Sequence, residues 1–345
     1  MILHRLRFHK AQIYCILCSL VLIFIALPAT AQVLRGSCGN PDPDVSIAGC
    51  TKRIASDTGD LQSARGSNQA ALAQLATDYD NRGIAYAAKG LYDQAVADYN
   101  QAIDLSPAFA VAYFNRASAT SNQGLDDQAA ADYTKAILLE PKGGGTDFNL
   151  ADAYDYRGNI YEHKFLTDQA IADYTMAVSL NPRLEAAYQN RGNDYARKAL
   201  YDLAIADFST VIALDPRNIP SYHNRALAYE HKSLYDDAIA DLTKEMSLAT
   251  TDAEVYDTRG LAYAHKGLYD LAIADYTREI ALNAKDIPLY PVFASRYAGA
   301  YSHRGDAYEH KGLTDAAVAD QRAALKLDPG MRSAKDALTR LGAAP

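Results

Sequence analysis

The sequence predicts an all-α solenoid of seven helix–turn–helix repeats. A 34-residue pattern recurs along the chain, and each copy contains two sets of apolar residues at helical spacing. A tyrosine three residues before an arginine marks each copy, at Tyr79, Tyr113, Tyr154, Tyr188, Tyr222, Tyr256 and Tyr301. Successive markers are 34 residues apart except for spacings of 41 and 45, so two insertions interrupt the period. A fixed period of this length is typical of a solenoid, in which each repeat buries its apolar face against its neighbours.

The fourth repeat shows how each copy is expected to fold. Tyr188 and Tyr195 are seven residues apart, on one face of a first helix. Ala199 occupies a place where four other repeats have glycine, so a turn with positive φ is expected to end this helix. An aspartate follows in every repeat, here Asp202, and its carboxylate is expected to accept backbone N–H groups and start a second helix. Pro216 then marks the end of that helix.

These features together resemble the tetratricopeptide repeat. The similarity lies in the first aromatic residue, the Gly or Ala after the arginine, the Ala-Tyr pair, the turn glycine, the Tyr-Asp-x-Ala motif and the final Leu-x-Pro, and it covers about residues 76–329. The resemblance implies a right-handed α-solenoid with repeats at residues 76–109, 110–143, 151–184, 185–218, 219–252, 253–286 and 298–331. Residues 330–345 are expected to form a C-terminal capping helix, because a solenoid must close its exposed core.

An arginine and an aspartate sixteen residues later recur in all seven repeats. The pairs are Arg82 with Asp98, Arg116 with Asp132, Arg157 with Asp173, Arg191 with Asp207, Arg225 with Asp241, Arg259 with Asp275 and Arg304 with Asp320. Because both charges always occur together, a structural ion pair within a repeat or between neighbouring repeats is favoured over a ladder of ligand-binding arginines.

Residues 1–31 are predicted to be a secretory signal peptide. A positively charged start precedes an apolar run at 13–27, and residues 29–31 supply small side chains for cleavage. The apolar run is shorter than the about 20 residues that a membrane-spanning helix needs, although a retained anchor is the alternative. We therefore expect an exported protein, periplasmic or extracellular, with no membrane association beyond the cleaved signal.

Residues 32–75 are predicted to form a disulfide-stapled cap followed by a linker. In an oxidising compartment Cys38 and Cys50 are expected to form a disulfide. The segment 47–54 parallels the second-helix segment 171–178, which places Cys50 where a repeat has its second-helix aromatic residue. We interpret residues 46–55 as a degenerate half-repeat that covers the first full repeat. Residues 56–75, which end in an Ala-rich run, are interpreted as a flexible connector that leads into a helix. No nearby histidine completes a metal site with these cysteines.

Composition narrows the classes of partner. The chain has a net charge of −8. The predicted signal peptide contains basic but no acidic residues, so its cleavage would make the net charge more negative. An acidic chain argues against nucleic acid and anionic membranes as partners. Most of the 25 tyrosines recur at core positions of the repeats, so they do not indicate a stacking platform for ligands. We expect no cofactor, no metal and no enzymatic activity, because no catalytic or phosphate-binding motif stands outside the repeat pattern.

The resemblance to the tetratricopeptide repeat family implies that the binding surface is a concave groove lined by the first helices. The matching positions in this chain are Asp80, Asn81, Phe114, Asn115, Asp155, Tyr156, Asn159, Glu162, His163, Gln189, Asn190, Asn193, Arg197, His223, Asn224, Glu230, His231, Asp257, His265, His303, Asp306 and His310. Including Asp152, Glu254 and Glu309, the predicted lining has nine carboxylates and one arginine. We therefore expect it to favour cationic or amide-rich protein segments, with salt-sensitive binding. The lysine that a clamp for C-terminal carboxylates requires is absent from the matching positions.

All six histidines after the signal peptide belong to this predicted lining. Histidine titrates near pH 6.5, so a row of them would make the charge of the groove depend on pH. Repetition of a tolerated polar residue at the helix ends is the alternative explanation, and metal binding is a weaker one.

Three functions remain open from the sequence. The favoured one is an exported scaffold that binds protein segments in its groove. A structural or self-associating solenoid without a peptide client is the alternative, and an enzyme is the least supported. The sequence names neither the client nor the oligomeric state.

Overall fold

The computed structural model describes residues 38–63, 69–140, 150–249, 253–283 and 294–344. Within these ranges the chain forms 16 helices and no strand, which confirms the predicted all-α class. The predicted signal peptide lies outside the described residues. The chain divides into two compact units, residues 1–98 and residues 99–345, and each is treated by itself.

The first unit contains α2 (Pro43–Ser63), α3 (Gln69–Ala88) and the beginning of α4 (Tyr92–Leu105). Residues 56–63 are helical, so the prediction of a flexible connector is wrong for this stretch. Helix α3 begins at Gln69, at the Ala-rich part of the segment that was expected to lead into a helix. Residues 64–68 of that connector lie outside the described residues.

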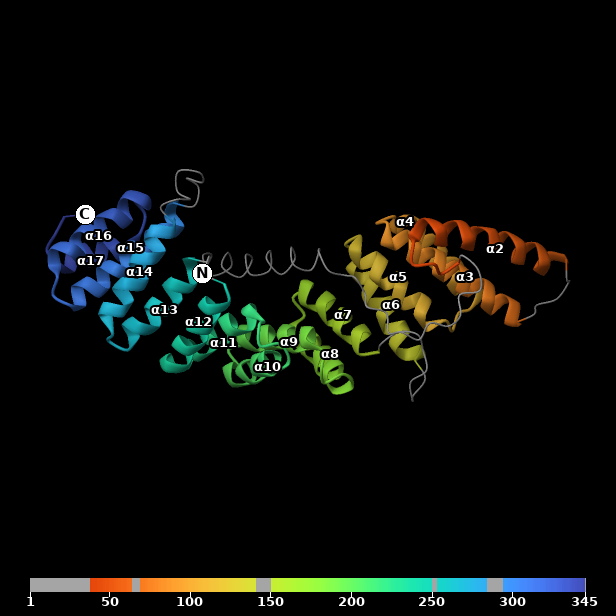
Figure 1. Cartoon of the computed structure of the whole chain (residues 1–345), viewed down its shortest axis with the longest axis horizontal. Helices are drawn as coiled ribbons and strands as arrows, with labels where there is room; N and C mark the ends of the chain where they lie inside the picture. Colours follow the sequence, from red (N-terminus) through yellow and green to blue (C-terminus); the bar gives the residue numbers. More distant parts are fainter. Residues whose placement is uncertain (1–37, 64–68, 141–149, 250–252, 284–293, 345) are drawn as a thin grey trace. The chain divides into compact units, whose positions relative to one another are not determined.

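The second unit alternates first and second helices (Figure 1). The first helices are α5 (Ala110–Asn122), α7 (Leu150–His163), α9 (Glu185–Arg197), α11 (Ile219–His231), α13 (Ala253–His265) and α15 (Ala294–His310). The second helices are α6 (Asp126–Leu139), α8 (Thr167–Leu180), α10 (Tyr201–Leu214), α12 (Tyr235–Leu248), α14 (Tyr269–Asn283) and α16 (Thr314–Leu327). The C-terminal helix predicted as a cap is α17 (Arg332–Arg340), which packs on α16.

Within a repeat, the second-helix aromatic ring packs directly on the backbone of the first helix. A Cβ atom added at Gly192 would lie 2.8 Å from Cε1 of Phe208, and one added at Gly260 would lie 2.6 Å from Cε1 of Tyr276. The rings of Phe208 and Tyr276 are at most 1% exposed. A small residue after the repeated arginine is therefore needed for helix packing, and the second-helix aromatic residues belong to the core, as predicted.

The turns inside the repeats have the predicted positive φ. Ala199 has φ 58°, close to Phe165 at 60° and Ser233 at 59°, and the glycines of the other turns have similar values. The N–H of Leu200 donates to the carbonyl of Tyr195 five residues earlier, at 2.8 Å. This pattern is a Schellman motif, which favours an apolar residue just after the positive-φ residue. It explains why all seven repeats have leucine there, although the side chain is about 40% exposed in most of them.

The recurrent aspartate at the start of the second helix does not cap it. Helix α10 begins at Tyr201, and the N-cap residue Leu200 makes no side-chain capping bond. Asp202 lies in the first turn instead, and its Oδ1 accepts from Nζ of Lys232 in the next repeat. The predicted capping role is therefore wrong. The carboxylate still opposes the helix dipole favourably, and it joins one repeat to the next.

The repeated arginine and aspartate form an ion pair within each repeat. In the fourth repeat, Nε and Nη2 of Arg191 donate to the two carboxylate oxygens of Asp207, both at 2.8 Å. The third nitrogen, Nη1, donates to Oγ1 of Thr175 in the preceding repeat at 3.1 Å. The guanidinium also lies over the rings of Tyr188 and Tyr195, 5.5 and 5.7 Å from their centroids. The same bidentate pair is present in all seven repeats, which confirms the structural interpretation.

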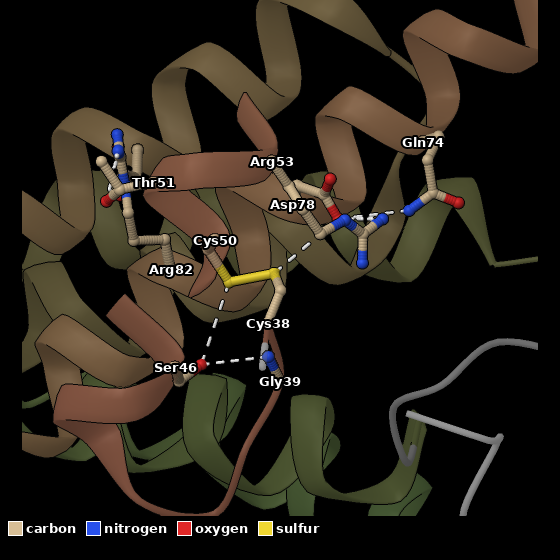
Figure 2. The surroundings of a disulfide bond; sticks show 10 residues. Cys38, Gly39, Ser46, Cys50, Thr51, Arg53, Gln74, Asp78 and Arg82 are labelled. Atoms are coloured by element: carbon tan, nitrogen blue, oxygen red, sulfur yellow. Dashed lines mark hydrogen bonds and ion pairs between the residues drawn. A yellow bond between two sulfur atoms is a disulfide. The ribbon is translucent and has the colours of Figure 1, made fainter. Parts of the chain in front are cut away.

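Helix α2 makes the contacts that second helices make in the later repeats. Figure 2 shows Cys38 joined to Cys50, and Thr51 beside Arg82. Oγ1 of Thr51 accepts from Nη1 of Arg82 at 3.2 Å, just as Thr175 accepts from its arginine. Lys89 pairs with the carboxylate of Asp44 in the first turn of α2, as the lysines of later repeats pair with theirs.

A buried ion pair distinguishes the cap from the other repeats. Asp78 is fully buried on α3, where the other first helices have alanine, serine or valine. Burial raises the pKa of Asp78, and the nearby Arg53 guanidinium lowers it. Nη2 of Arg53 lies 2.9 Å from Oδ1 of Asp78, and Gln74 donates to the same oxygen (Figure 2). The carboxylate at this unusual position is thus balanced by a cation from α2.

Candidate protein-binding face

The first helices of the second unit approach one another directly. Helix α7 contacts α9, and the same holds along the series α9, α11, α13, α15 and α17. Among the described residues, no comparable approach links two second helices. The stack is therefore tighter on the side of the first helices. We call the surface on that side, formed by α5, α7, α9, α11, α13 and α15, the first-helix face.

The middle of the first-helix face carries a ladder of amide side chains. Nδ2 of Asn190 donates to Oδ1 of Asn159 at 2.8 Å, and Nδ2 of Asn224 donates to Oδ1 of Asn193 at 2.9 Å. Each bond joins one first helix to the next. Gln189 belongs to the same region, where its Oε1 accepts from the Ser221 hydroxyl. The structure therefore joins these five predicted residues in two sets that share helix α9: Asn159 with Asn190, and Asn193 with Gln189 and Asn224.

The single arginine of the predicted lining is engaged by the protein itself. Nη2 of Arg197 lies 2.6 Å from Oε1 of Glu162 on the neighbouring first helix and 2.8 Å from Oδ1 of Asp194. Asp194 is fully buried, and burial raises its pKa to about 7 although the Arg197 charge lowers it. Asp194 was not among the predicted residues. The signal for it is a carboxylate at a place where the other six repeats have alanine or isoleucine.

Three predicted residues of the last three repeats have partners that join or support first helices. Nδ1 of His303 lies 2.7 Å from Oδ1 of Asp257 on the preceding first helix. Nδ1 of His223 lies 3.1 Å from Oε2 of Glu245, a buried residue of a second helix that the sequence analysis missed. Glu245 stands where the preceding repeat has a buried valine, which was the available signal.

Two further carboxylates are partly compensated. Nδ1 of His265 lies 3.9 Å from Oε1 of Glu230, and burial raises the pKa of Glu230. Asp306 accepts from Nε2 of Gln321 at 3.0 Å and lies 3.6 Å from Nη2 of Arg340 in the capping helix. The face is thus less acidic than the count of its carboxylates suggests.

The six histidines do not form one uniform row. His231, His265 and His310 are exposed near the ends of first helices, and each lies against a tyrosine that begins the preceding second helix. The ring centroids are 4.6 Å apart for Tyr201 and His231, 4.9 Å for Tyr235 and His265, and 4.8 Å for Tyr269 and His310. His163 occupies the equivalent exposed place, and there the preceding second helix begins with an aspartate. Only His223 and His303 are half-buried beside carboxylates.

An aromatic and acidic cluster lies where α5, α6 and α7 meet. The ring centroids of Phe114, Tyr133 and Tyr156 are 5.6 to 6.0 Å apart. Asp155 is 4% exposed, and its Oδ1 is buried without a hydrogen-bond partner among the described residues. The side chains of Asn190 and Asn159 hydrogen-bond to the same carboxylate. Burial and then the charge of Asp152 raise the pKa of Asp155 to about 7.

The remaining predicted residues lie on both units. Asp80 and Asn81 belong to α3 of the first unit, where Asp80 is buried and Asn81 half-buried. Asn115 is half-buried on α5 of the second unit. Across the described ranges, no group of three or more histidine, cysteine or acidic side chains is arranged to hold a metal ion. No helix in those ranges is both long enough and apolar enough to cross a bilayer.

Comparisons with known proteins identify the repeats. A family model described as TPR repeat matches residues 83–124, and one described as tetratricopeptide repeat matches residues 110–142, 253–286 and 298–331. These segments of the chain are therefore similar to tetratricopeptide repeats. No curated protein matches the sequence.

The first solved structure in this comparison shares the fold. The C-terminal part of a TPR repeat-containing protein from Cytophaga hutchinsonii is 20% identical, with a TM-score of 0.61 over 74% of this chain and 98% of that chain. A tetratricopeptide repeat protein from Parabacteroides merdae is 19% identical, with a TM-score of 0.48 over 77% of this chain and 98% of that chain. YrrB, described as a TPR protein with an unusual peptide-binding site, is 19% identical, with a TM-score of 0.48 over 58% of this chain and 95% of that chain.

Proposed function

We propose that this chain is an exported scaffold that binds cationic or amide-rich segments of a partner protein on its first-helix face. The observation that carries the proposal is the amide ladder of Asn159, Asn190, Asn193 and Asn224. An amide side chain has two N–H donors and two acceptor lone pairs. Oδ1 of Asn159 also accepts from the Tyr174 hydroxyl and Oδ1 of Asn193 from Gln189, so the capacity left beyond the ladder is greatest at Asn190 and Asn224. A row of such groups suits the backbone of an extended segment, which offers donors and acceptors at regular intervals.

Charge supports a cationic segment. Glu162, Glu230 and Asp257 have basic or histidine partners, but these partners come from the same face and only partly offset the carboxylates. Asp155 has no such partner among the charged groups that act on it most strongly. A surface with excess carboxylates attracts cationic partners and repels acidic ones, and added salt screens both effects.

Export is supported by the sequence of residues 1–31 and by the cap. The Cys38–Cys50 bond has both sulfur atoms in a buried position of the first unit. Disulfides of this structural kind persist in oxidising compartments and are rare in the cytosol.

The binding proposal is tested with labelled twelve-residue peptides, alternating Lys and Gly or alternating Glu and Gly, by fluorescence anisotropy. We expect the lysine peptide to bind the protein and the glutamate peptide not to. Raising the salt concentration from about 50 to 300 mM should weaken the binding about tenfold. A variant with Asp155→Asn, Glu230→Gln and Asp257→Asn should also bind the lysine peptide more weakly.

A matched control separates the first-helix face from general attraction to an acidic protein. Asp104, Asp237 and Asp315 are exposed residues of second helices, and changing all three to Asn removes at least as much negative charge. Equal effects of the two triple variants would contradict binding on the first-helix face.

Self-association is a second candidate because several large apolar side chains of the second helices are exposed. Leu138 is 75%, Met176 43% and Leu180 47% exposed. Light scattering on the chain without peptide distinguishes the two functions. A stable oligomer that binds neither peptide would favour the structural role.

A further inference from the structure

The amide ladder of the first-helix face gives way to ionisable pairs in the last three repeats. His303 occupies the repeat position of the ladder residue Asn224, but its Nδ1 lies 2.7 Å from Oδ1 of Asp257 on the preceding first helix. Nδ1 of His223 lies 3.1 Å from Oε2 of Glu245 in the second helix of its own repeat. In this part of the face, two pairs whose net charge can change stand beside or in place of neutral amide bonds.

The pair of His223 and Glu245 combines two departures from the repeat pattern. Where His223 stands, the other six repeats have Asp, Gln, Phe or Ser. Where Glu245 stands, four repeats have alanine, one has valine and one has glutamate. Helix packing does not require either residue, because other repeats fold without them. The pair is therefore an addition to the common repeat.

The middle of the same face is compensated by a permanent charge instead. Nη2 of Arg197 lies 2.6 Å from Oε1 of Glu162 and 2.8 Å from Oδ1 of Asp194. A guanidinium stays protonated in proteins, whereas a histidine ordinarily titrates near pH 6.5. The carboxylates beside His223 and His303 are therefore compensated in acid and uncompensated above neutral pH.

Both histidine pairs keep their hydrogen bond in either charge state. An ionised carboxylate can only accept, so Nδ1 carries a proton whether the imidazole ring is neutral or charged. The second proton enters at Nε2 and changes the net charge of the pair from −1 to zero. The side chains of His223 and His303 are 22% and 30% exposed, so a segment bound on the face lies close to this change of charge.

The surroundings of His303 are mainly acidic. Helix α13 contributes Asp257, and α14 contributes the buried Glu279 and Tyr276, whose ring centroid is 5.7 Å from that of His303. On α15 itself, the charge of His303 lowers the pKa of Asp306, although burial raises it more strongly.

Two residues from the end of the stack are engaged with other partners. Gln321 of α16 donates to Oδ1 of Asp306 at 3.0 Å. Nη2 of Arg340 in α17 lies 3.6 Å from the same oxygen and 2.9 Å from Oε2 of Glu309. These contacts serve Asp306 and Glu309, and the partner of Nδ1 of His303 is the carboxylate of Asp257.

The surroundings of His223 are acidic or neutral. Glu245 comes from α12 and Glu230 from α11 itself. Helix α9 presents neutral amides to α11, since Gln189 bonds to a serine and Asn193 to an asparagine of that helix. Burial and the Asp257 charge raise the pKa of Glu230, whereas the charges of His223 and His303 lower it. The two histidine pairs therefore act on the same part of the face.

Other cations of α11 and α15 are held in the ion pairs that every repeat has. The pairs are Arg225 with Asp241, Arg304 with Asp320, Lys232 with Asp202 and Lys311 with Asp270. These pairs do not change charge in the range where histidine titrates, because arginine and lysine stay protonated there.

We propose that His223 and His303 weaken binding of the cationic segment as pH falls from about 8 to 5.5. This inference rests on the proposed function, because it concerns the same segment on the same face. It goes further in that it assigns a pH dependence to two of the six histidines and fixes its sign: protonation adds positive charge where a positive segment binds.

The test measures binding of the labelled lysine–glycine peptide by fluorescence anisotropy at about pH 8 and about pH 5.5, where its lysines stay charged. The variant is His223→Gln with His303→Gln, because glutamine retains a donor and an acceptor but gains no charge. At the higher pH the variant and the wild type should bind equally. At the lower pH the variant should bind about tenfold more tightly, or about threefold for each charge that it avoids.

Comparing variant and wild type at one pH removes other contributions. Asp155 and Asp194 have pKa values of about 7 and also titrate in this range, but they are present in both proteins. A gain in affinity at the lower pH is a result that a merely structural role for the two histidines would not produce.

His163→Gln with His231→Gln is the matched control. Both residues are exposed near the ends of first helices, and the change removes the same number of titrating groups. At about 100 mM salt, which screens exposed charges, this variant should bind within about twofold of the wild type at both pH values. Circular dichroism at both pH values verifies folding, and either single variant, with an expected gain of about threefold, can replace the double one.

The outcomes separate the pH dependence from the proposed function. Failure of the peptide to bind the wild-type chain at either pH would overturn both. Binding to the wild type, with no gain for the folded His223→Gln and His303→Gln variant at the lower pH, would leave the function standing and overturn the inference. An equal gain for the control variant would also overturn it, because any histidine of the chain would then have the same effect.

Discussion

Neutralising one buried aspartate of the repeated ion pair should destabilise the second unit strongly. The change is Asp207→Asn, which leaves the Arg191 guanidinium without its bidentate partner. The side chains of Arg191 and Asp207 are only 13% and 7% exposed, so water cannot replace the lost carboxylate. Removing one member of a buried ion pair costs about 3–5 kcal/mol, because the other charge remains buried and uncompensated.

Two other variants of the same repeat test the estimated cost of Asp207→Asn. Replacing both partners, with Arg191→Met and Asp207→Leu, removes the buried charge altogether and should cost less than the single change. Asp202→Asn breaks the pair with Lys232, but the Asp202 side chain is 81% exposed. An exposed pair contributes about 0–1 kcal/mol, so this variant should be nearly as stable as the wild type.

Urea unfolding followed by circular dichroism measures these differences, and hydrogen exchange shows whether residues 185–214 open first. Because solenoids unfold partly repeat by repeat, the exchange measurement locates the loss. The reasoning would be refuted if Asp207→Asn and Asp202→Asn had equal effects. It would also be refuted if the double replacement were less stable than Asp207→Asn, since the ion pair would then stabilise the repeat in its own right.

Three further predictions follow from other parts of the structure. Replacing Cys38 and Cys50 by serine should cost about 3 kcal/mol on the chain-entropy estimate for so short a loop, and thermal unfolding should show a loss confined to the first unit; an equal loss in both units would contradict this. Gly192→Ala should destabilise the chain by about 1–3 kcal/mol, because the added Cβ would lie 2.8 Å from the Phe208 ring; unchanged urea unfolding would show that the ring moves aside freely. Asp155 binds a proton in the folded chain up to a pKa of about 7, whereas the unfolded chain releases it near the ordinary value of 3.8. Asp155 therefore makes stability fall as pH rises from about 4 to 7, and Asp155→Asn should remove that part of the decline in urea unfolding at several pH values; an unchanged slope would count against the raised pKa.

Much of the fold could be predicted because every repeat contains the same helix-forming and packing residues at the same spacing. The spacing of Tyr188 and Tyr195 and the small residue Gly192 depend only on contacts within one helix pair, so the sequence of one repeat contains both partners. The arginine–aspartate pair was predictable for the same reason, since its sixteen-residue separation never varies. The half-repeat around Cys50 was recognisable because it keeps the register of a second helix.

Features that depend on contacts between repeats were harder to predict. Asp202 suits both a helix cap and an ion pair with the next repeat, and only the backbone geometry distinguishes them. The stacking of His231 on Tyr201 joins residues of different repeats. The 34-residue pattern does not indicate which positions of one repeat contact which positions of the next. On the candidate face, Phe114 and Tyr156 lie on either side of an insertion that lengthens the repeat spacing from 34 to 41 residues, so the period did not indicate that their rings meet.

Burial of carboxylates was the least predictable property. Asp194 and Glu245 stand where most other repeats have small or apolar residues, which identifies them as unusual but not as paired. Their partners, Arg197 and His223, are surface-type residues that the sequence placed on the binding face. The structure shows that part of that predicted face serves the protein's own charges.

The N-terminal half-repeat offers its neighbour the contacts that any complete repeat would offer. Thr51 and Asp44 receive the arginine and the lysine of the following helix in the same way as Thr175 and Asp168 do further along. If this segment were grafted in front of an array shortened from its N-terminus, the first helix of the array would therefore find the same contacts that a preceding repeat provides. The segment is in effect a transferable end-piece, suited to terminating engineered arrays of related helical hairpins for use in oxidising media.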